Sequence, residues 1–124
     1  MTRFLTLTQA LRAAEAVIGE TPLVRDIGLV ESALARPRTS VLGKDAYPSL
    51  DQKAAAMLQS LATNHPLVDG NKRMAFACAS VFLTMNRAPL TLDDESQAYD
   101  LVIAVATSAL RDVHEIARAL REGM

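Results

Sequence analysis

The fold of this chain is decided by one stretch of sequence, HPLVDGNKR followed directly by MAFACASVFLTM, at positions 65–85. The second part, Met74 to Met85, is apolar on nearly every helical face, and such a helix belongs in the centre of a fold. The first part crowds a histidine, a carboxylate, a glycine, an amide and two cations at the entrance to that helix. Polar and charged groups beside a core are costly unless they have partners. The stretch therefore predicts a central helix that begins at a ligand-binding loop.

The composition favours a helical domain. Of 124 residues, 50% are hydrophobic but only 4% are aromatic. Alanine and leucine dominate, and they lose least free energy on entering a helix. A chain of this length can bury a core without disulfides or metals, so we expect one domain over residues 1–124.

Charge and cysteine content exclude several classes of protein. The net charge is −1 at pH 7, so no broad basic surface indicates direct binding to nucleic acid. The single cysteine, Cys78, excludes an internal disulfide and is expected to be an inert core residue in a reducing cytosol. The N-terminus has no signal-peptide pattern, and the longest uncharged apolar runs, 74–86 and 101–110, are shorter than the ~20 residues of a membrane span. We therefore expect a cytoplasmic protein that does not bind membranes.

Helical periodicity and capping residues divide the chain into about six helices around the apolar central one. The expected helices are Thr8 to Ile18 capped by Thr8, Ile27 to Ala35 capped by Asp26, Asp51 to Asn64 capped by Asp51, Asn71 to Asn86, Asp94 to Leu110 capped by Asp93, and Val113 to Arg121 capped by Asp112. Gly19 and Pro37 are expected to end the first two. Residues 38–48 have no helical period, and their Gly43-Lys44-Asp45 tip is a turn signal. The sequence predicts an all-α fold with a short flap or β-hairpin.

The groups of the loop fit a phosphate chain and a divalent metal. The free N–H groups of a helix that begins near Asn71 form an anion site. Lys72 and Arg73 stand in its first turn, where the helix dipole disfavours a cation by ~0.3–1 kcal/mol, and a bound anion removes that conflict. Gly70 lets the backbone approach a ligand closely, and Asn71 can orient a phosphate or a metal-bound water. Asp69 can hold Mg²⁺, which takes one or two carboxylates besides ligand oxygens and water.

His65 is the candidate general base, because histidine is the side chain that most often serves this role near neutral pH. Leu58, Leu61 and His65 recur at three- and four-residue steps, which is one face of a helix. We therefore expect His65 to leave its helix on the buried side. Taken singly, the loop residues also fit a plain helix–loop–helix turn with a capping histidine and solvated cations. Their occurrence together favours the ligand-binding interpretation.

The stretch His65–Arg73 resembles the signature of the Fic/Doc family, His-Pro-Phe-x-Asp/Glu-Gly-Asn-Gly/Lys-Arg, and departs from it only at Leu67. The segments GLVESALARP at 28–37 and Tyr47-Pro48 agree as well. The likeness runs from about position 24 to position 87. It is nearest to the death-on-curing (Doc) branch, the toxins of type II toxin–antitoxin pairs.

The resemblance implies an all-α Fic/Doc fold and an enzyme that uses ATP and Mg²⁺ to modify a hydroxyl group of a target protein. It implies that His65 is the catalytic base and that Asp69 is the metal carboxylate. The nucleotide phosphates would be bound by Gly70, Asn71, Lys72 and Arg73. The flap would pair with the backbone of the target, through Val41, Leu42, Gly43, Lys44 and Tyr47.

Departures from the family pattern bear on the reaction. Lys72 occupies a position that is glycine in AMP-transferring members and lysine in Doc, and Phe76 replaces a second arginine of those members. Both differences favour phosphoryl transfer to elongation factor Tu, which inhibits translation, over AMP transfer. Gly70, however, is alanine in Doc, so the sequence is intermediate. Leu67, in place of phenylalanine, is expected to pack into the core.

Two alternatives stay open: protein AMP transfer (an adenylyltransferase), and a catalytically silent helical module that binds a nucleotide or a partner. Some Fic proteins carry an inhibitory helix, but Arg118 stands where its motif needs serine or threonine before Glu122-Gly123. The Doc likeness instead implies a cognate small antitoxin, whose disordered tail docks as a helix in a groove.

Four further features are expected to be structural or peripheral. His114 is read as a surface or capping residue, and the acidic run at 93–95 as a solvated helix start. Arg36 and Arg38 flank Pro37 just before the flap and are read as exposed charges, with contact to a target or partner as the alternative.

Overall fold

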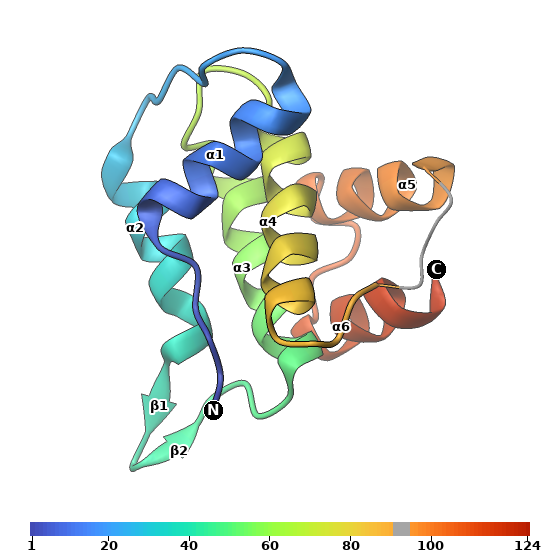
Figure 1. Ribbon diagram of the computed structural model, residues 1–124. Helices are drawn as coiled ribbons and strands as arrows, with labels where there is room; N and C mark the ends of the chain where they lie inside the picture. Colours follow the sequence, from blue (N-terminus) through green and yellow to red (C-terminus); the bar gives the residue numbers. More distant parts are fainter. Residues whose placement is uncertain (91–94) are drawn as a thin grey trace.

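The computed structural model describes residues 1–90 and 95–124. Within them lie six α-helices, one 3₁₀ helix and one two-stranded hairpin (Figure 1). The elements are α1 (Leu7–Ile18), α2 (Ile27–Ala35), η1 (Arg36–Arg38), β1 (Ser40–Val41), β2 (Lys44–Asp45), α3 (Leu50–Asn64), α4 (Asn71–Met85), α5 (Glu95–Ala106) and α6 (Val113–Glu122). The predicted helical class with a small hairpin is confirmed. The predicted cap Asp93 and the first part of the acidic run lie outside the described residues.

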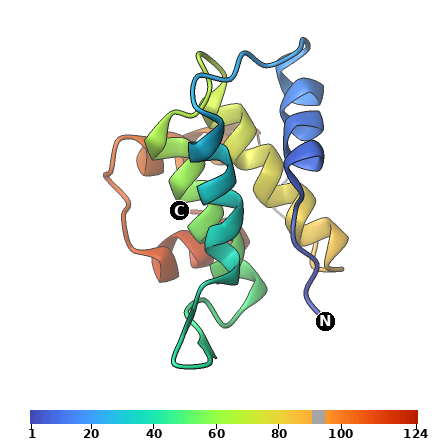
Figure 2. The same ribbon diagram turned by 90° about the vertical axis from the view of Figure 1, so that its left-hand side faces the viewer.

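The central pair of the fold is α3 and α4. Helices α2 and α6 pack on α3, helix α1 packs on α4, and helix α5 packs on both, so the pair is covered on both sides (Figures 1 and 2). The buried residues of α4 include Met74, Cys78 and Phe82, which confirms the prediction of a central helix. Its small residues Ala75 and Ala79 are fully buried and allow close approach of the neighbouring backbones.

Cys78 is an inert member of this core, as predicted. Burial raises the pKa of its thiol to about 12, and only the thiolate is a reactive nucleophile. None of the helices in residues 1–90 and 95–124 is both long and apolar enough to cross a bilayer.

Two helices begin earlier than predicted because capping boxes start them. The Thr6 hydroxyl accepts a hydrogen bond from the Gln9 N–H (3.1 Å), and the Gln9 side chain accepts one from the Thr6 N–H (3.0 Å). Ser49 and Gln52 form the same arrangement at the start of α3. The box satisfies two N–H groups at once. The predictions of Thr8 and Asp51 as caps are therefore wrong.

The remaining described helix ends follow the sequence signals more closely. Asp26 and Asp112 cap α2 and α6 through their carboxylates, and Gly19 ends α1 in the left-handed region at φ 90°. Helix α5 ends before the predicted Leu110. Ser108 takes the left-handed conformation there (φ 64°), a position at which glycine is the usual signal.

The capping box of α1 can be tested by a pair of substitutions. Thr6→Ala removes the cap and should lower the free energy of unfolding by about 1 kcal/mol. Thr8→Ala, on an exposed position inside the helix, should leave stability unchanged or slightly raised, since alanine has the higher helix propensity. Urea denaturation curves measure both, and equal losses would contradict the assignment of Thr6.

Candidate active site

A cleft of about 740 Å³ opens where α4 begins. Its volume lies in the range of small-molecule sites, roughly 300–1,000 Å³. The end of α1, the loop between α3 and α4, the start of α4 and one face of α5 form its walls. Every residue predicted for the base, the metal and the phosphates lines this cleft: His65, Asp69, Gly70, Asn71, Lys72 and Arg73. Most of the other lining residues are apolar, among them Val17, Ile18, Phe76, Ala77, Ala98, Tyr99 and Val102, while Glu20, Thr21 and Glu95 add polar groups.

His65 ends α3 in the left-handed conformation, with φ 51° and ψ 59°. The residue is exposed and lines the cleft, so the prediction that it leaves the helix on the buried side is wrong. That prediction extended the helical period of Leu58 and Leu61 by one more turn. The left-handed residue breaks the period, so the side chain leaves the buried face.

The loop after His65 is docked onto the segment that precedes α2. The Pro66 carbonyl accepts hydrogen bonds from the N–H groups of Arg25 (2.8 Å) and Asp26 (3.0 Å), and the Val68 N–H donates to the Leu23 carbonyl (2.9 Å). Val24 and Leu67 form an isolated antiparallel bridge. Leu67 is only 1% exposed, so it fills the core position expected for the family's phenylalanine.

Asn71 closes the same loop with its side chain. Its Oδ1 accepts a hydrogen bond from the Leu67 N–H (2.8 Å), and its Nδ2 donates to the Leu67 carbonyl (3.0 Å). The side-chain amide of Asn71 is therefore engaged in hydrogen bonds within the loop. What Asn71 offers to an anion is its backbone N–H at the start of α4, a group without an intrahelical partner.

A glycine is favoured at position 70, at the head of α4, for two reasons. Its φ of 90° lies in the left-handed region, which glycine adopts without steric cost. A Cβ atom at this position would also stand 2.6 Å from Cδ1 and 2.9 Å from Cγ1 of Ile18. With no side chain at this N-cap, the first N–H groups of α4 are left for a ligand.

The charged groups of the cleft are solvent-accessible. Asp69, Lys72 and Arg73 are exposed, and Asp69 Oδ1 accepts a hydrogen bond from the Gly70 N–H (2.9 Å). Within the described ranges the ion pairs are Lys53–Asp45 and Arg121–Asp51, so neither cation of the cleft is neutralised by one of them.

No cluster of three or more histidine, cysteine or acidic residues in the described part of the chain could hold a metal by itself. A metal at Asp69 would therefore share its coordination with ligand oxygens and water. This fits the way Mg²⁺ is bound beside phosphates.

The predicted flap is a hairpin, but it lies away from the cleft. Ser40 pairs with Asp45 and Val41 with Lys44, and Leu42 and Gly43 turn the chain with φ 53° and 79°, as a tight two-residue hairpin turn requires. Both views place the hairpin at the end of the bundle opposite the loop that carries His65 (Figures 1 and 2). The 15 residues of α3 separate the two, a span of about 22 Å at 1.5 Å per residue.

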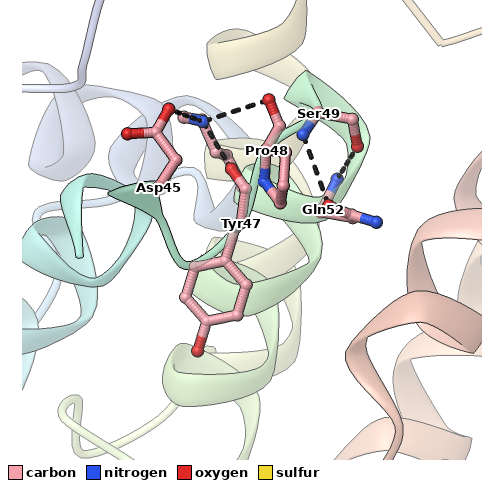
Figure 3. A network of polar contacts seen from close by, with 6 residues as sticks. Asp45, Tyr47, Pro48, Ser49 and Gln52 are labelled. Atoms are coloured by element: carbon pink, nitrogen blue, oxygen red, sulfur yellow. Dashed lines mark hydrogen bonds and ion pairs between the residues drawn. The ribbon is translucent and has the colours of Figure 1, made fainter. Parts of the chain in front are cut away.

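Two cations anchor the base of this hairpin. Lys53, 3% exposed, donates from Nζ to Asp45 Oδ2 (3.1 Å) and to the carbonyls of Tyr47 and Pro48 (Figure 3). Arg36 donates to the Tyr47 hydroxyl (3.0 Å) and lies 5.4 Å from the centre of its ring.

Arg36 further bonds α3, through the Ala56 carbonyl, Gln59 and Ser60. Arg36 is half-buried, so its interpretation as an exposed charge is wrong, and these bonds give it a structural role. Arg38 is exposed, as predicted, and its guanidinium lies 4.9 Å from the centre of the Phe4 ring. His114 is a surface residue, as predicted, and its Nδ1 lies 2.8 Å from Gln52 Nε2.

Three residues that shape these sites were missed from the sequence: Arg25, which contacts the loop, Ile18 beneath Gly70, and Lys53. Each acts through a contact that the fold creates. A buried lysine at position 53 had only one sequence signal, its place directly before the buried run Ala54 to Leu58.

The comparisons with known proteins identify the family of this chain. Residues 4–83 match the family model described as "Fic/DOC family". The chain belongs to the Fic/Doc family. Its sequence is 51% identical over 108 residues to the protein named Toxin Doc of Mycolicibacterium smegmatis (strain ATCC 700084 / mc(2)155), a match that covers 86% of this chain and 83% of that protein.

Because Gly70 lies close to Ile18, the effect of a substitution at Gly70 should depend on the size of the side chain at position 18. Gly70→Ala should lower the affinity for a nucleotide, tested with ATP, about tenfold or more, since either Ile18 or the start of α4 must shift, and an alanine at positive φ adds roughly 1–2 kcal/mol of strain. Adding Ile18→Ala should recover part of the loss by making room. Calorimetry of ATP binding measures both variants. If the double variant binds as poorly as Gly70→Ala, then steric contact is not the cause.

Proposed function

We propose that this chain is a Doc-type toxin that transfers a phosphoryl group from ATP–Mg²⁺ to a hydroxyl group of a target protein. The observation that carries the proposal is the convergence of a histidine, a carboxylate, two cations and an uncapped helix start on one cleft. The 51% identity to Toxin Doc supports the toxin assignment. Family membership supports a nucleotide as the substrate.

Each polar group of the cleft has its own role in the proposed reaction. The N–H groups at the start of α4, with Lys72 and Arg73, bind the phosphates and hold the γ-phosphate in place. Asp69 offers the carboxylate for Mg²⁺, which neutralises charge on the phosphate oxygens when bound. His65 accepts the proton of the target hydroxyl as its oxygen attacks phosphorus. The new O–P bond forms, the bond to the β-phosphate oxygen breaks, and ADP leaves.

Phosphoryl transfer is favoured over AMP transfer by the cation pattern. Phe76 is half-buried on the cleft wall, at the position where AMP-transferring members carry a second arginine, so it adds no charge to bind a further phosphate. Gly70 argues against phosphoryl transfer, because a glycine here fits the general signature of the family, whereas Doc has alanine. AMP transfer is therefore the second candidate, and a silent binding module the third.

The Doc likeness supports a proposal for the target and for the partner. Elongation factor Tu is the proposed target, which would place the protein in the cytoplasm. A small cognate antitoxin is the proposed partner. The exposed hairpin side chains Val41 and Leu42 would contact the target at a distance from the cleft, since the hairpin and His65 lie at opposite ends of the bundle.

Labelled ATP separates the three candidate functions. With elongation factor Tu present, γ-labelled ATP should label the target and α-labelled ATP should not. The reverse result would establish AMP transfer. If neither label is transferred to elongation factor Tu or to any protein of a bacterial lysate, while calorimetry detects ATP binding, then the chain is a silent module and the proposed transfer is wrong.

His65→Ala should slow transfer by about 10²–10⁴-fold, the usual contribution of a general base, while ATP binding stays within about twofold. His114→Ala is the matched control, because it removes the other histidine of the chain far from the cleft. Quenched-flow measurement of single-turnover rates separates the two variants. A wild-type rate in His65→Ala would remove His65 from the reaction.

A further inference from the structure

One arginine from a distant segment holds the backbone of the proposed base. Arg25 donates from Nε (2.9 Å) and from Nη2 (2.6 Å) to the His65 carbonyl, and from Nη2 to the Asn64 carbonyl (3.0 Å). Its backbone N–H donates to the Pro66 carbonyl (2.8 Å). A single residue thus contacts three consecutive carbonyl groups, those before, at and after His65.

The contacts between the Arg25 guanidinium and the carbonyl groups of Asn64 and His65 are electrostatically favourable. The carbonyl groups of Asn64 and His65 lie at the C-terminal end of α3, where a helix has unpaired acceptors and the negative end of its dipole. A guanidinium is a planar fork with several donors, so it can bond two neighbouring carbonyls together. Lysine offers the same charge without the fork.

The conformation of His65 explains why such a contact is needed. A left-handed residue other than glycine costs roughly 1–2 kcal/mol, and His65 has a φ of 51°. The same conformation turns its side chain away from the buried face and into the cleft. Released from its contacts, the residue would relax towards conformations that point the imidazole elsewhere.

We propose that Arg25 is a positioning residue for His65: it fixes the left-handed turn that presents the imidazole to the reacting hydroxyl. The role in catalysis rests on the proposed function. Arg25 is not among the residues that line the cleft, whereas the proposed phosphate ligands belong to α4. Arg25 is therefore expected to affect the transfer step and not the binding of ATP.

The two histidines of the chain allow a direct test by NMR of their ring signals. In Arg25→Ala, the His65 signal should shift and broaden, while the His114 signal stays in place and reports that the protein is folded. Arg25→Lys should also disturb His65, since it keeps the charge but loses the fork. Arg12→Ala, which removes an exposed arginine of α1, should change neither signal. An unchanged His65 signal in Arg25→Ala, or a change in Arg25→Ala alone and not in Arg25→Lys, would overturn the proposal.

Kinetics test whether Arg25 acts through His65. Arg25→Ala should lower kcat about 10- to 100-fold, the scale of a misplaced catalytic group, with KM for ATP within about twofold. In a His65→Ala background, Arg25→Ala should cause no further loss, because the effects of residues that act as a unit do not add. Additive losses, or a parallel rise in KM, would contradict the role.

The two proposals fail in different ways. If the protein transfers no group from ATP to any target, the proposed function is wrong. The ring signals would still decide whether Arg25 fixes the conformation of His65.

Discussion

The site depends on one backbone docking, in which the segment before α2 lies against the loop between α3 and α4. Its hydrogen bonds join Leu23, Arg25 and Asp26 to Pro66 and Val68, and Leu67 is buried beneath them. Full burial of a leucine contributes roughly 1.5–3 kcal/mol, so the loop is held by the core as well as by its polar contacts. A loop fixed in this way can present functional groups at set positions before any ligand arrives.

The start of α4 has several locally destabilising features, which a bound anion would offset. Gly70 leaves the helix without a side-chain cap, and Lys72 and Arg73 lie in the first turn, where the dipole disfavours cations. His65 stands in a strained backbone conformation on the other side of the loop. Local rules of this kind are broken mainly at functional sites. Their concentration within nine residues agrees with the phosphate chemistry we propose.

At the opposite end of the bundle, charged side chains have a structural role and hold the hairpin in place. There the hairpin is anchored by buried Lys53 and by Arg36, each of which bonds several oxygen atoms. The base of the hairpin is therefore ordered by the same helix, α3, that ends in His65. The exposed turn at Leu42, 98% accessible, is free to meet another molecule without disturbing the cleft.

The sequence by itself determined the helical class, the central apolar helix, the hairpin and the grouping of polar residues between His65 and Arg73, because these follow from local periodicity and from residues adjacent in the chain. Only the tertiary structure decided the direction of His65, the use of the Asn71 side-chain amide within the loop, the structural roles of half-buried Arg36 and buried Lys53, and the distance between hairpin and cleft. Each of these is set by partners far away in sequence, as Arg25 is from His65. The sequence pattern of a single segment does not predict contacts with residues that are distant in the chain.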